Sequence, residues 1–344
     1  LEYIPATLKV VEYVSAHYGC PKCKTDEEKP NIIHAPVPPA LLRSYASPSI
    51  VAWVIYSKYV NGMPLYRQEK DWLQYGFELS RATMANWVIE CTDKYLRVLY
   101  EFYHRLLLSR EFAMADESPI QVLKEEGREA TAKSYIWLFR SGEDDTPPIV
   151  LYKYASTRRG DVAKEFLKGF NGYLMADGYT GYNKVQDIKR CCCFAHIRRY
   201  FFDAIPKGKN RDISCPAVQG VEYCDKLFAY ERHFKEKGYS YKQIKNGRLK
   251  KEKPVIEAFL SWLEKQKPIK GSKFATAVTY ALNRKEHMMT YLEDGRCSLS
   301  NNLSEQKMKS YVIGRKGWLF SDSPEGAEAS AISYSIAETA LANG

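Results

Sequence analysis

Hydrophobic and polar positions change their period along the chain, and this change divides the chain into regions. Between residues 45 and 110, apolar residues recur every three or four positions, which is typical of amphipathic helices. Ser47 followed by Pro48 is a favoured start for a first helix, and Ser80 is a favoured N-cap for a second, longer one. The pattern predicts a helical region at residues 44–110.

A shorter period begins at residue 111. Short apolar runs separated by turn residues predict five strands, with a short helix capped by Asp161 between the third and the fourth. Residues 197–290 return to helical spacing with charged loops, and the rest is mostly helical with a turn at 314–317. Strands mixed with helices in this way indicate an α/β fold. The runs predicted as strands are 111–116, 133–140, 147–155, 172–177 and 190–196.

Two of these predicted strands run directly into an aspartate, Asp116 or Asp177. Taken singly, Asp177-Gly178 is a common hairpin turn and Asp116 a common strand end. Taken together, neighbouring strands would bring both carboxylates to one edge of a sheet, where α/β folds bind ligands. Close carboxylates repel one another unless a cation is present, and Mg²⁺ favours oxygen ligands of this kind. The pair therefore predicts a divalent-metal site. The alternative is that Asp177 forms a hairpin turn and Asp116 ends a strand.

Glu305 is the candidate for a third acid. It follows Ser300, Asn301 and Asn302, whose side chains favour a helix N-terminus, so a helix is predicted to begin near them. An amphipathic surface helix with ordinary salt bridges fits the same spacing. Four cations follow the acid and would suit DNA phosphates beside a metal site, namely Lys307, Lys309, Arg315 and Lys316.

Composition favours a polyanionic partner and a reduced compartment. The formal net charge is +10 at pH 7. Residues 235–253 carry eight Lys or Arg against two Glu, and this segment is either a surface that binds phosphates or an ordinary solvated surface. Nine cysteines, three of them consecutive at 191–193, fit reduced thiols better than disulfides. No apolar run approaches the roughly 20 residues that span a bilayer, so no membrane is expected. The first residue is not Met, which suggests a start inside a longer protein.

Four ordered motifs follow one another along the chain: MADESPIQV (114–122), ADGYTGYN (176–183), CFAHIRRYFF (193–202), and NNLSEQKMK (301–309) with GRKGWLF (314–320). Together they resemble the transposases of the IS66 type of bacterial insertion sequence, over about residues 1–340. The resemblance implies a DDE transposase with a ribonuclease-H-like core, a mixed five-stranded sheet flanked by helices. It implies that Asp116, Asp177 and Glu305 are the acidic triad, binding two Mg²⁺ or Mn²⁺ ions. The catalytic domain would occupy residues 111–344, with a helical insertion at about 200–295.

The chemistry implied by this resemblance is phosphoryl transfer on DNA. Water would cleave phosphodiester bonds at the element ends, and the freed 3′-hydroxyl would then attack target DNA, with no Ser or Tyr nucleophile. The implied partners are the terminal inverted repeats, target DNA, further copies of the chain and accessory proteins of the element, in the bacterial cytoplasm at the nucleoid. An inactive, domesticated DNA-binding relative and a nuclease on the same core are the alternatives.

Cys193 and His196 form a C-x-x-H motif that Arg198 and Arg199 follow. The plain interpretation is a buried strand cysteine and a hydrogen-bonded histidine. The resemblance points instead to the start of the insertion, where the pair could bind metal, shape the site or contact DNA. A complete zinc site would need two further ligands.

The first 110 residues carry two further candidate sites. Residues 1–43 are predicted to be short strands and a proline-rich linker, with Cys20 and Cys23 as half of a zinc site. Residues 62–92 have the pattern of a helix-turn-helix with a turn at Gly76, although a plain helical hairpin fits equally. Trp318 is predicted to be a core residue, with base stacking as the alternative. The residues expected to face DNA from the second helix of this pair are Arg81, Thr83 and Asn86.

Overall fold

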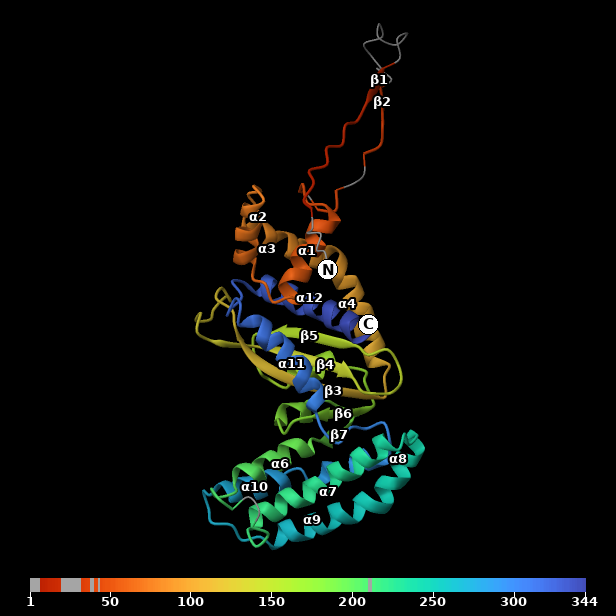
Figure 1. The fold of residues 1–344 in the computed structure, drawn as a ribbon, viewed down its shortest axis with the longest axis vertical. Helices are drawn as coiled ribbons and strands as arrows, with labels where there is room; N and C mark the ends of the chain where they lie inside the picture. The colour runs from red at the N-terminus through yellow and green to blue at the C-terminus, as the bar shows by residue number, and fades with distance from the viewer. Residues whose placement is uncertain (1–6, 20–31, 38–39, 43, 210–211) are drawn as a thin grey trace, which may run out of the picture.

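A five-stranded mixed sheet lies at the centre of the computed structural model, which describes residues 7–19, 32–37, 40–42, 44–209 and 212–344 (Figure 1). Its strand order is β5-β4-β3-β6-β7. The first three strands along the chain pair as antiparallel neighbours, and β6 and β7 add in parallel beside β3. The predicted α/β class is confirmed. The strands are β3 (Phe112–Gln121), β4 (Lys133–Ser141), β5 (Val150–Ala155), β6 (Tyr173–Ala176) and β7 (Lys189–Cys192).

β3 is longer than its apolar run predicts. Its pairing with β4 continues through Asp116↔Leu138 to Gln121↔Lys133, so Asp116 lies in the middle of the strand. The prediction that Asp116 ends a strand is therefore wrong, because backbone pairing to β4 sustains the strand where the side-chain pattern turns polar. The parallel pairing of β3 to β6 does end just before this aspartate, at Met114↔Met175.

Two further local predictions are also corrected. α5 (Asp161–Phe166) begins at Asp161 rather than being capped by it, because the N-cap position is Gly160. Asp177-Gly178 is not a hairpin turn: a 3₁₀ helix, η3 (Thr180–Lys184), follows it, and the next strand runs parallel to β6. A parallel partner needs a crossover connection and cannot be reached by a two-residue turn.

The helices before the sheet begin where the sequence predicts. Ser47 accepts a hydrogen bond from the Ile50 N–H at the start of α1, and Ser80 accepts one from Thr83 N–H at the start of α3. Gly76 has a φ of +74°, as the predicted turn requires. Met84, Trp87 and Val88 of α3 are buried in the core that this helix forms with α1 and α12 (Pro324–Ala342). These helices are α1 (Pro48–Tyr59), α2 (Leu65–Gln74), α3 (Arg81–Cys91), the π-helix η2 (Thr92–Leu96) and α4 (Arg97–Leu108).

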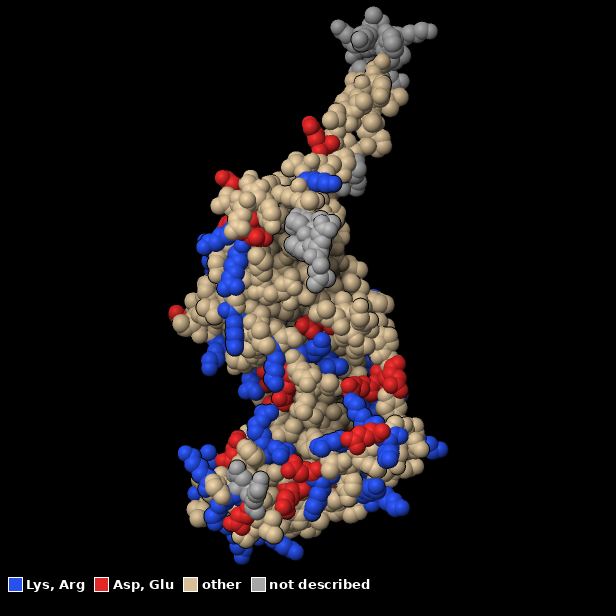
Figure 2. Space-filling model, viewed as in Figure 1, with Lys and Arg blue, Asp and Glu red and all other residues tan. Residues whose placement is uncertain are grey.

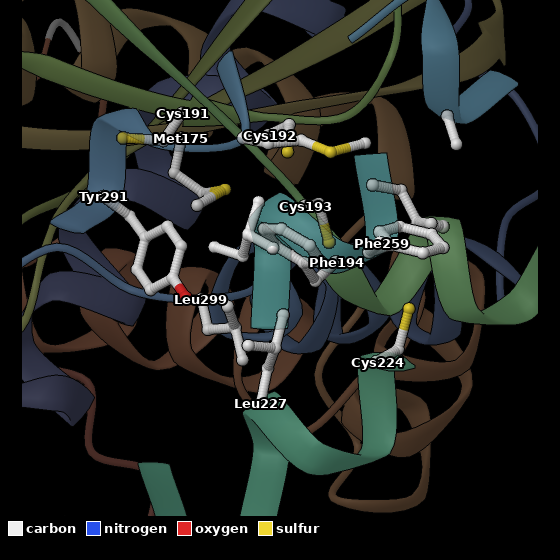
Figure 3. Close-up of a cluster of buried hydrophobic side chains, with 14 of the residues drawn as sticks. Met175, Cys191, Cys192, Cys193, Phe194, Cys224, Leu227, Phe259, Tyr291 and Leu299 are labelled. Atoms are coloured by element: carbon white, nitrogen blue, oxygen red, sulfur yellow. The ribbon is translucent and has the colours of Figure 1, made fainter. Parts of the chain in front are cut away.

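The helices after β7 form a layer of their own below the sheet edge (Figure 1). Their core is rich in sulfur, since Cys191, Cys192, Cys193 and Cys224 are all buried in it with Met175 (Figure 3). The separation of this layer from the rest as an insertion stays a prediction, like the other domain boundaries. Its elements are α6 (Phe194–Asp203), α7 (Pro216–Glu236), α8 (Tyr241–Gly247), η4 (Arg248–Glu252), α9 (Lys253–Lys265), α10 (Lys273–Leu282), η5 (Lys285–His287) and η6 (Thr290–Glu293).

The last two helices return to the sheet. α11 (Asn302–Arg315) packs its Met308 and Tyr311 with Ile136 and Leu138 of β4, and α12 (Pro324–Ala342) runs along β5. The N-terminal residues extend as a short hairpin of β1 (His17–Gly19) and β2 (Ile32–His34), and residues 7–16 before it form no strand, contrary to the prediction. In the part of the chain that the structure describes, none of the helices combines the length and apolar character of a membrane span.

Candidate active site

Strand register brings the two aspartates to the same level of the sheet. Met114 of β3 pairs with Met175 of β6, so two residues further along Asp116 stands beside Asp177. Ala176 of β6 pairs with Cys192 of β7, so Asp177 in turn stands beside Cys193. Neighbouring strands are about 4.8 Å apart, and residues at one level of parallel strands face the same side. Asp116, Asp177 and Cys193 therefore form a row across three strands.

Asp116 lies in a strongly negative environment. Its pKa is raised to about 7, mainly by burial and also by the charges of Glu117, Asp177 and Glu305, while a hydrogen bond from the Glu117 N–H to Asp116 Oδ1 at 2.9 Å acts in the opposite direction. The three acids that the sequence singled out thus act on one another electrostatically. Such an arrangement favours either a proton on Asp116 or a bound cation.

Glu305 reaches this row from the first turn of α11. The N-terminus of α11 is tied to the sheet, because Asn301 Nδ2 donates to the Ala115 carbonyl of β3 at 2.8 Å. Asn301 occupies the N-cap position, as predicted, but its side chain makes this contact instead of capping the helix. Glu305 Oε2 lies 3.4 Å from Arg199 Nη2, and Glu305 Oε1 lies 3.7 Å from His196 Nδ1.

The loop after β6 holds Asp177 in place. The Tyr179 N–H donates to Asp177 Oδ1 at 2.8 Å, and Arg284 Nη2 donates to the Gly178 carbonyl at 2.7 Å. Arg284 lies so close that a Cβ atom at position 178 would be 1.7 Å from its Nη2. Glycine therefore permits the close approach of an arginine from beyond α10, and a side chain at position 178 would push this guanidinium away.

A cavity of about 600 Å³ opens beside Asp177 and His196. Arg158, Arg199 and Arg284 line it, so a negatively charged ligand would meet cations next to the acids. A larger cavity of about 720 Å³ lies elsewhere and has none of the three acids in its wall. Size alone therefore does not mark the site. Figure 2 shows Lys and Arg side chains over the lower helices, with Asp and Glu side chains among them.

Cys193 and His196 lie against Glu305. One ligand atom from each of the three lies within 4.8 Å of the others, which makes them a candidate metal-binding group. Burial raises the pKa of the Cys193 thiol to about 11, although the N–H groups of Asn301, His196 and Ala195 act in the opposite direction. Burial lowers the pKa of His196, which keeps its imidazole neutral. The interpretation of His196 as a hydrogen-bonded core histidine is wrong for its Nδ1, which has no hydrogen-bond partner among the described residues.

The family model described as "Transposase IS66 family" matches residues 43–329. The chain belongs to the IS66 transposase family. Two relatives from Sinorhizobium fredii carry only the names "Uncharacterized protein y4hP" and "Uncharacterized protein y4qI". The first is 28% identical over all of this chain, and the second is 29% identical over 91% of it. The chain spans 64% and 60% of the length of these two proteins.

Sequence reasoning missed Glu117, which lies directly beside Asp116 in this IS66 chain. Its side chain accepts a hydrogen bond from Tyr182 Oη at 2.5 Å and is paired with Arg158, whose Nη2 is 2.6 Å away. Burial raises the pKa of Glu117, and the hydrogen bond from Tyr182 lowers it. Glu117 thereby positions Arg158 at the cavity. The one sign of Glu117 in the sequence was its position next to Asp116. Its partners Tyr182 and Arg158 are 65 and 41 residues away, so no local pattern links them to it.

Some of the cations predicted to face DNA contact other residues of the fold, and others are exposed to solvent. Arg199 contacts Glu305, whereas Arg198 turns to Asp225 of α7, with its Nε 2.5 Å from Oδ1. Lys307 pairs with Glu338 of α12 at 2.7 Å, and Arg315 donates to the Pro119 carbonyl. These two cations serve contacts within the fold rather than surrounding Glu305. The side chains of Lys309 and Lys316 are exposed.

The remaining predicted residues lie in the N-terminal half. Arg81 and Asn86 are exposed on α3, while Thr83 is half-buried and belongs to the cap of that helix, with its hydroxyl 2.9 Å from that of Ser80. Their role toward DNA stays a prediction. Cys20 and Cys23 lie outside the described residues. Trp318 is half-buried and packs edge-on against Tyr59, consistent with the predicted core role.

Proposed function

We propose that this chain is the DDE catalytic part of an IS66 transposase that cleaves DNA at the ends of its element and joins them to target DNA. The observation that carries the proposal is the row of acids. Asp116 of β3 and Asp177, the residue after β6, stand side by side, Glu305 faces them from α11, and a cavity with three arginines adjoins them. Membership of the IS66 family supports the same reaction.

The sheet topology supports a ribonuclease-H-like core for this proposal. Three antiparallel strands are followed by two parallel ones in the order β5-β4-β3-β6-β7, and the acids emerge where β6 joins the central strand. Ligands of open α/β sheets bind beyond the carboxyl ends of strands at a switch in strand order. The helices between β7 and α11 would then be an insertion within the catalytic domain, next to its site.

The donor set fits Mg²⁺ or Mn²⁺. Asp116 and Asp177 offer carboxylate oxygens, and the pKa of Asp116 is raised first by burial and then by the neighbouring charges of Glu117, Asp177 and Glu305, which a bound cation would offset. We propose that these two acids hold the divalent ions with Glu305. When bound, such ions supply Lewis-acid stabilisation of the attacking and leaving oxygens of a phosphodiester.

The chain's own residues would bind and orient the DNA backbone. Arg158, Arg199 and Arg284 line the cavity and are suited to phosphate oxygens. Glu117 fixes Arg158, and the Gly178 carbonyl fixes Arg284, so two of these cations are held in place before DNA arrives. Water is the first nucleophile and the freed 3′-hydroxyl is the second, so no side chain forms a covalent bond to DNA. Further copies of the chain and the element's inverted repeats are the proposed partners.

A paired substitution tests this function. Asp177→Asn removes one charge at the site, and Asp187→Asn makes the same change at an exposed residue whose φ of 59° asparagine tolerates. We expect Asp177→Asn to lower Mg²⁺-dependent joining of an element-end oligonucleotide to plasmid DNA by about 10³-fold, while DNA binding persists. Asp187→Asn should join like the parent.

Three outcomes of this experiment would count against the proposal in different ways. Equal joining by the parent and Asp177→Asn would locate catalysis elsewhere. Mg²⁺-dependent cutting with no joining of a free 3′-hydroxyl end would make the chain a nuclease. Binding of element ends with neither reaction by the parent would make it a DNA-binding relative without activity.

A further inference from the structure

We propose that Cys193, His196 and Glu305 form a binding site for a borderline divalent cation of the Zn²⁺ class, separate in its ligands from the carboxylates of Asp116 and Asp177. The three ligand atoms already lie within 4.8 Å of one another. The atoms around a tetrahedral Zn²⁺ ion are separated by about 3.3–3.8 Å, given its bond lengths to nitrogen, oxygen and sulfur. Only a small closing movement would thus be needed.

Two polar atoms of this group are left without hydrogen-bond partners. His196 Nδ1 and Glu305 Oε1 are buried, and neither has a hydrogen-bond partner among the described residues. They face each other at 3.7 Å, which is too long for a hydrogen bond and suits two ligands of one ion. Glu305 Oε2 is directed to Arg199 instead, so the two oxygens of this carboxylate have different surroundings.

Backbone N–H groups at the Cys193 sulfur offset part of what burial costs a thiolate. Cys193 is the N-cap residue of α6, and its Sγ accepts the N–H of Asn301, the N-cap residue of α11, at 3.2 Å. Helix N-termini favour negative charge, and a coordinating metal removes the thiol proton, which would pass to solvent. His196 also lines the 600 Å³ cavity, so an ion could reach the site from solvent.

Ligand chemistry decides the class of ion. Mg²⁺ takes oxygen ligands, whereas a thiolate and an imidazole select Zn²⁺, Co²⁺ and similar ions. Two anionic ligands and a neutral imidazole balance the charge of one divalent ion. Three protein ligands leave a fourth position open, as in zinc sites that bind water or substrate.

The test is a Co²⁺ titration of the full chain, stripped of metal with a chelator. The starting protein carries Cys20→Ser and Cys23→Ser, because that C-x-x-C could itself bind cobalt. We expect a near-ultraviolet thiolate-to-cobalt absorption that saturates at about one equivalent and that Zn²⁺ removes but excess Mg²⁺ does not. Cys193→Ser should abolish the band. Cys224→Ser, which changes another buried cysteine of the same core, should keep it.

Two further variants keep the test decisive. If Cys193→Ser fails to fold, His196→Gln should weaken Co²⁺ binding at least about tenfold. Asp116→Asn should leave the band in place, because its carboxylate is not a ligand of this ion. Glu305 also belongs to the proposed acidic triad, so the readout is metal binding and not cleavage. No band, a band that survives Cys193→Ser, unchanged affinity in His196→Gln or displacement by Mg²⁺ would each overturn the site.

Discussion

Two buried groups of charged side chains, one in the helical layer and one at the sheet, differ in how well their charges are balanced. In the helical layer, Arg248 is 2% exposed and binds both oxygens of Glu231 at 2.7 Å. It also donates to the carbonyls of Tyr291, Asp294 and Cys297. At the sheet, three acids meet with Arg199 at 3.4 Å from Glu305 and a neutral His196.

The difference separates a structural network from a binding site. Arg248 has a planar fork whose donors are satisfied by acceptors from four residues, so this guanidinium needs no further partner. At the sheet, neighbouring acids repel the buried carboxylate of Asp116, and Glu305 Oε1 has no hydrogen-bond partner among the described residues, which a metal ion would relieve. Arg248 also falls in the basic segment 235–253 that the sequence offered as a DNA-facing surface, and its burial shows that it does not contribute to that surface.

The largest effect on stability is expected from breaking the balanced network. Arg248→Met should lower the free energy of unfolding by about 3–5 kcal/mol, because it leaves Glu231 and three carbonyls without their donor. Arg199→Met, at a side chain that is 54% exposed, should change it by less than about 1 kcal/mol. Urea denaturation of both variants provides the comparison, and equal losses would contradict the distinction between the two groups.

At the acids of the sheet, we expect a substitution to change the free energy of unfolding in the opposite direction. Without divalent ions at pH 8, Asp116→Asn should raise the free energy of unfolding by about 1–3 kcal/mol, because it removes a buried charge that neighbouring acids repel. Chemical denaturation in the presence of a chelator measures this. Glu231→Gln is the matched control in the balanced network and should destabilise. A loss of stability in both variants would show that Asp116 is compensated in the fold.

Glu252 should have a smaller effect on the free energy of unfolding, and this effect depends on pH. Burial and the charge of Glu231 raise its pKa from 4.5 to about 8, so between these values the folded chain holds a proton that the unfolded chain has lost. Its contribution to stability is therefore full below about pH 4.5 and is lost as the pH rises through about 8. Glu252→Gln should flatten the fall in stability between pH 5 and 8 by roughly 1–2 kcal/mol. A parallel pH profile for the parent and the variant would contradict this assignment.

The smallest effect is expected from the exposed cations of α11. Replacing Lys309 and Lys316 together by Ala should weaken binding of double-stranded DNA by about 3–10-fold at low salt and reduce the salt dependence by one or two phosphate contacts. Lys307→Ala is the contrasting variant: because Lys307 pairs with Glu338, it should cost stability more than DNA affinity. Fluorescence anisotropy at several salt concentrations measures the affinities, and an unchanged salt slope would remove these lysines from the interface.

Local patterns predicted much of the fold but not its long-range contacts. The period change at residue 111, the caps at Ser47 and Ser80 and the start of α11 are properties of a few adjacent residues. The length of β3 was wrong because β4 decides it through backbone hydrogen bonds, which side-chain alternation does not report. Strand register is likewise a pairing property, and local patterns leave open which residues of two neighbouring strands stand side by side.

The same limit applies to the site. Asp116, Asp177, Cys193 and His196 carry local motifs, and the sequence found them. Arg284 comes from beyond α10, over 100 residues after Gly178, and meets it only in the folded chain. Nothing beside Arg284 in the sequence marks it as a site residue. Asn301 was expected as a helix cap, but its side chain is used to fasten α11 to β3.

The central claim is that acids from β3, β6 and α11 jointly hold a divalent ion, and anomalous diffraction from a crystal soaked in Mn²⁺ tests it most directly. The account predicts an anomalous peak in contact with carboxylate oxygens of both Asp116 and Asp177, lost in an Asp116→Asn crystal. Manganese bound only elsewhere, with both aspartates free at a saturating concentration, would contradict it.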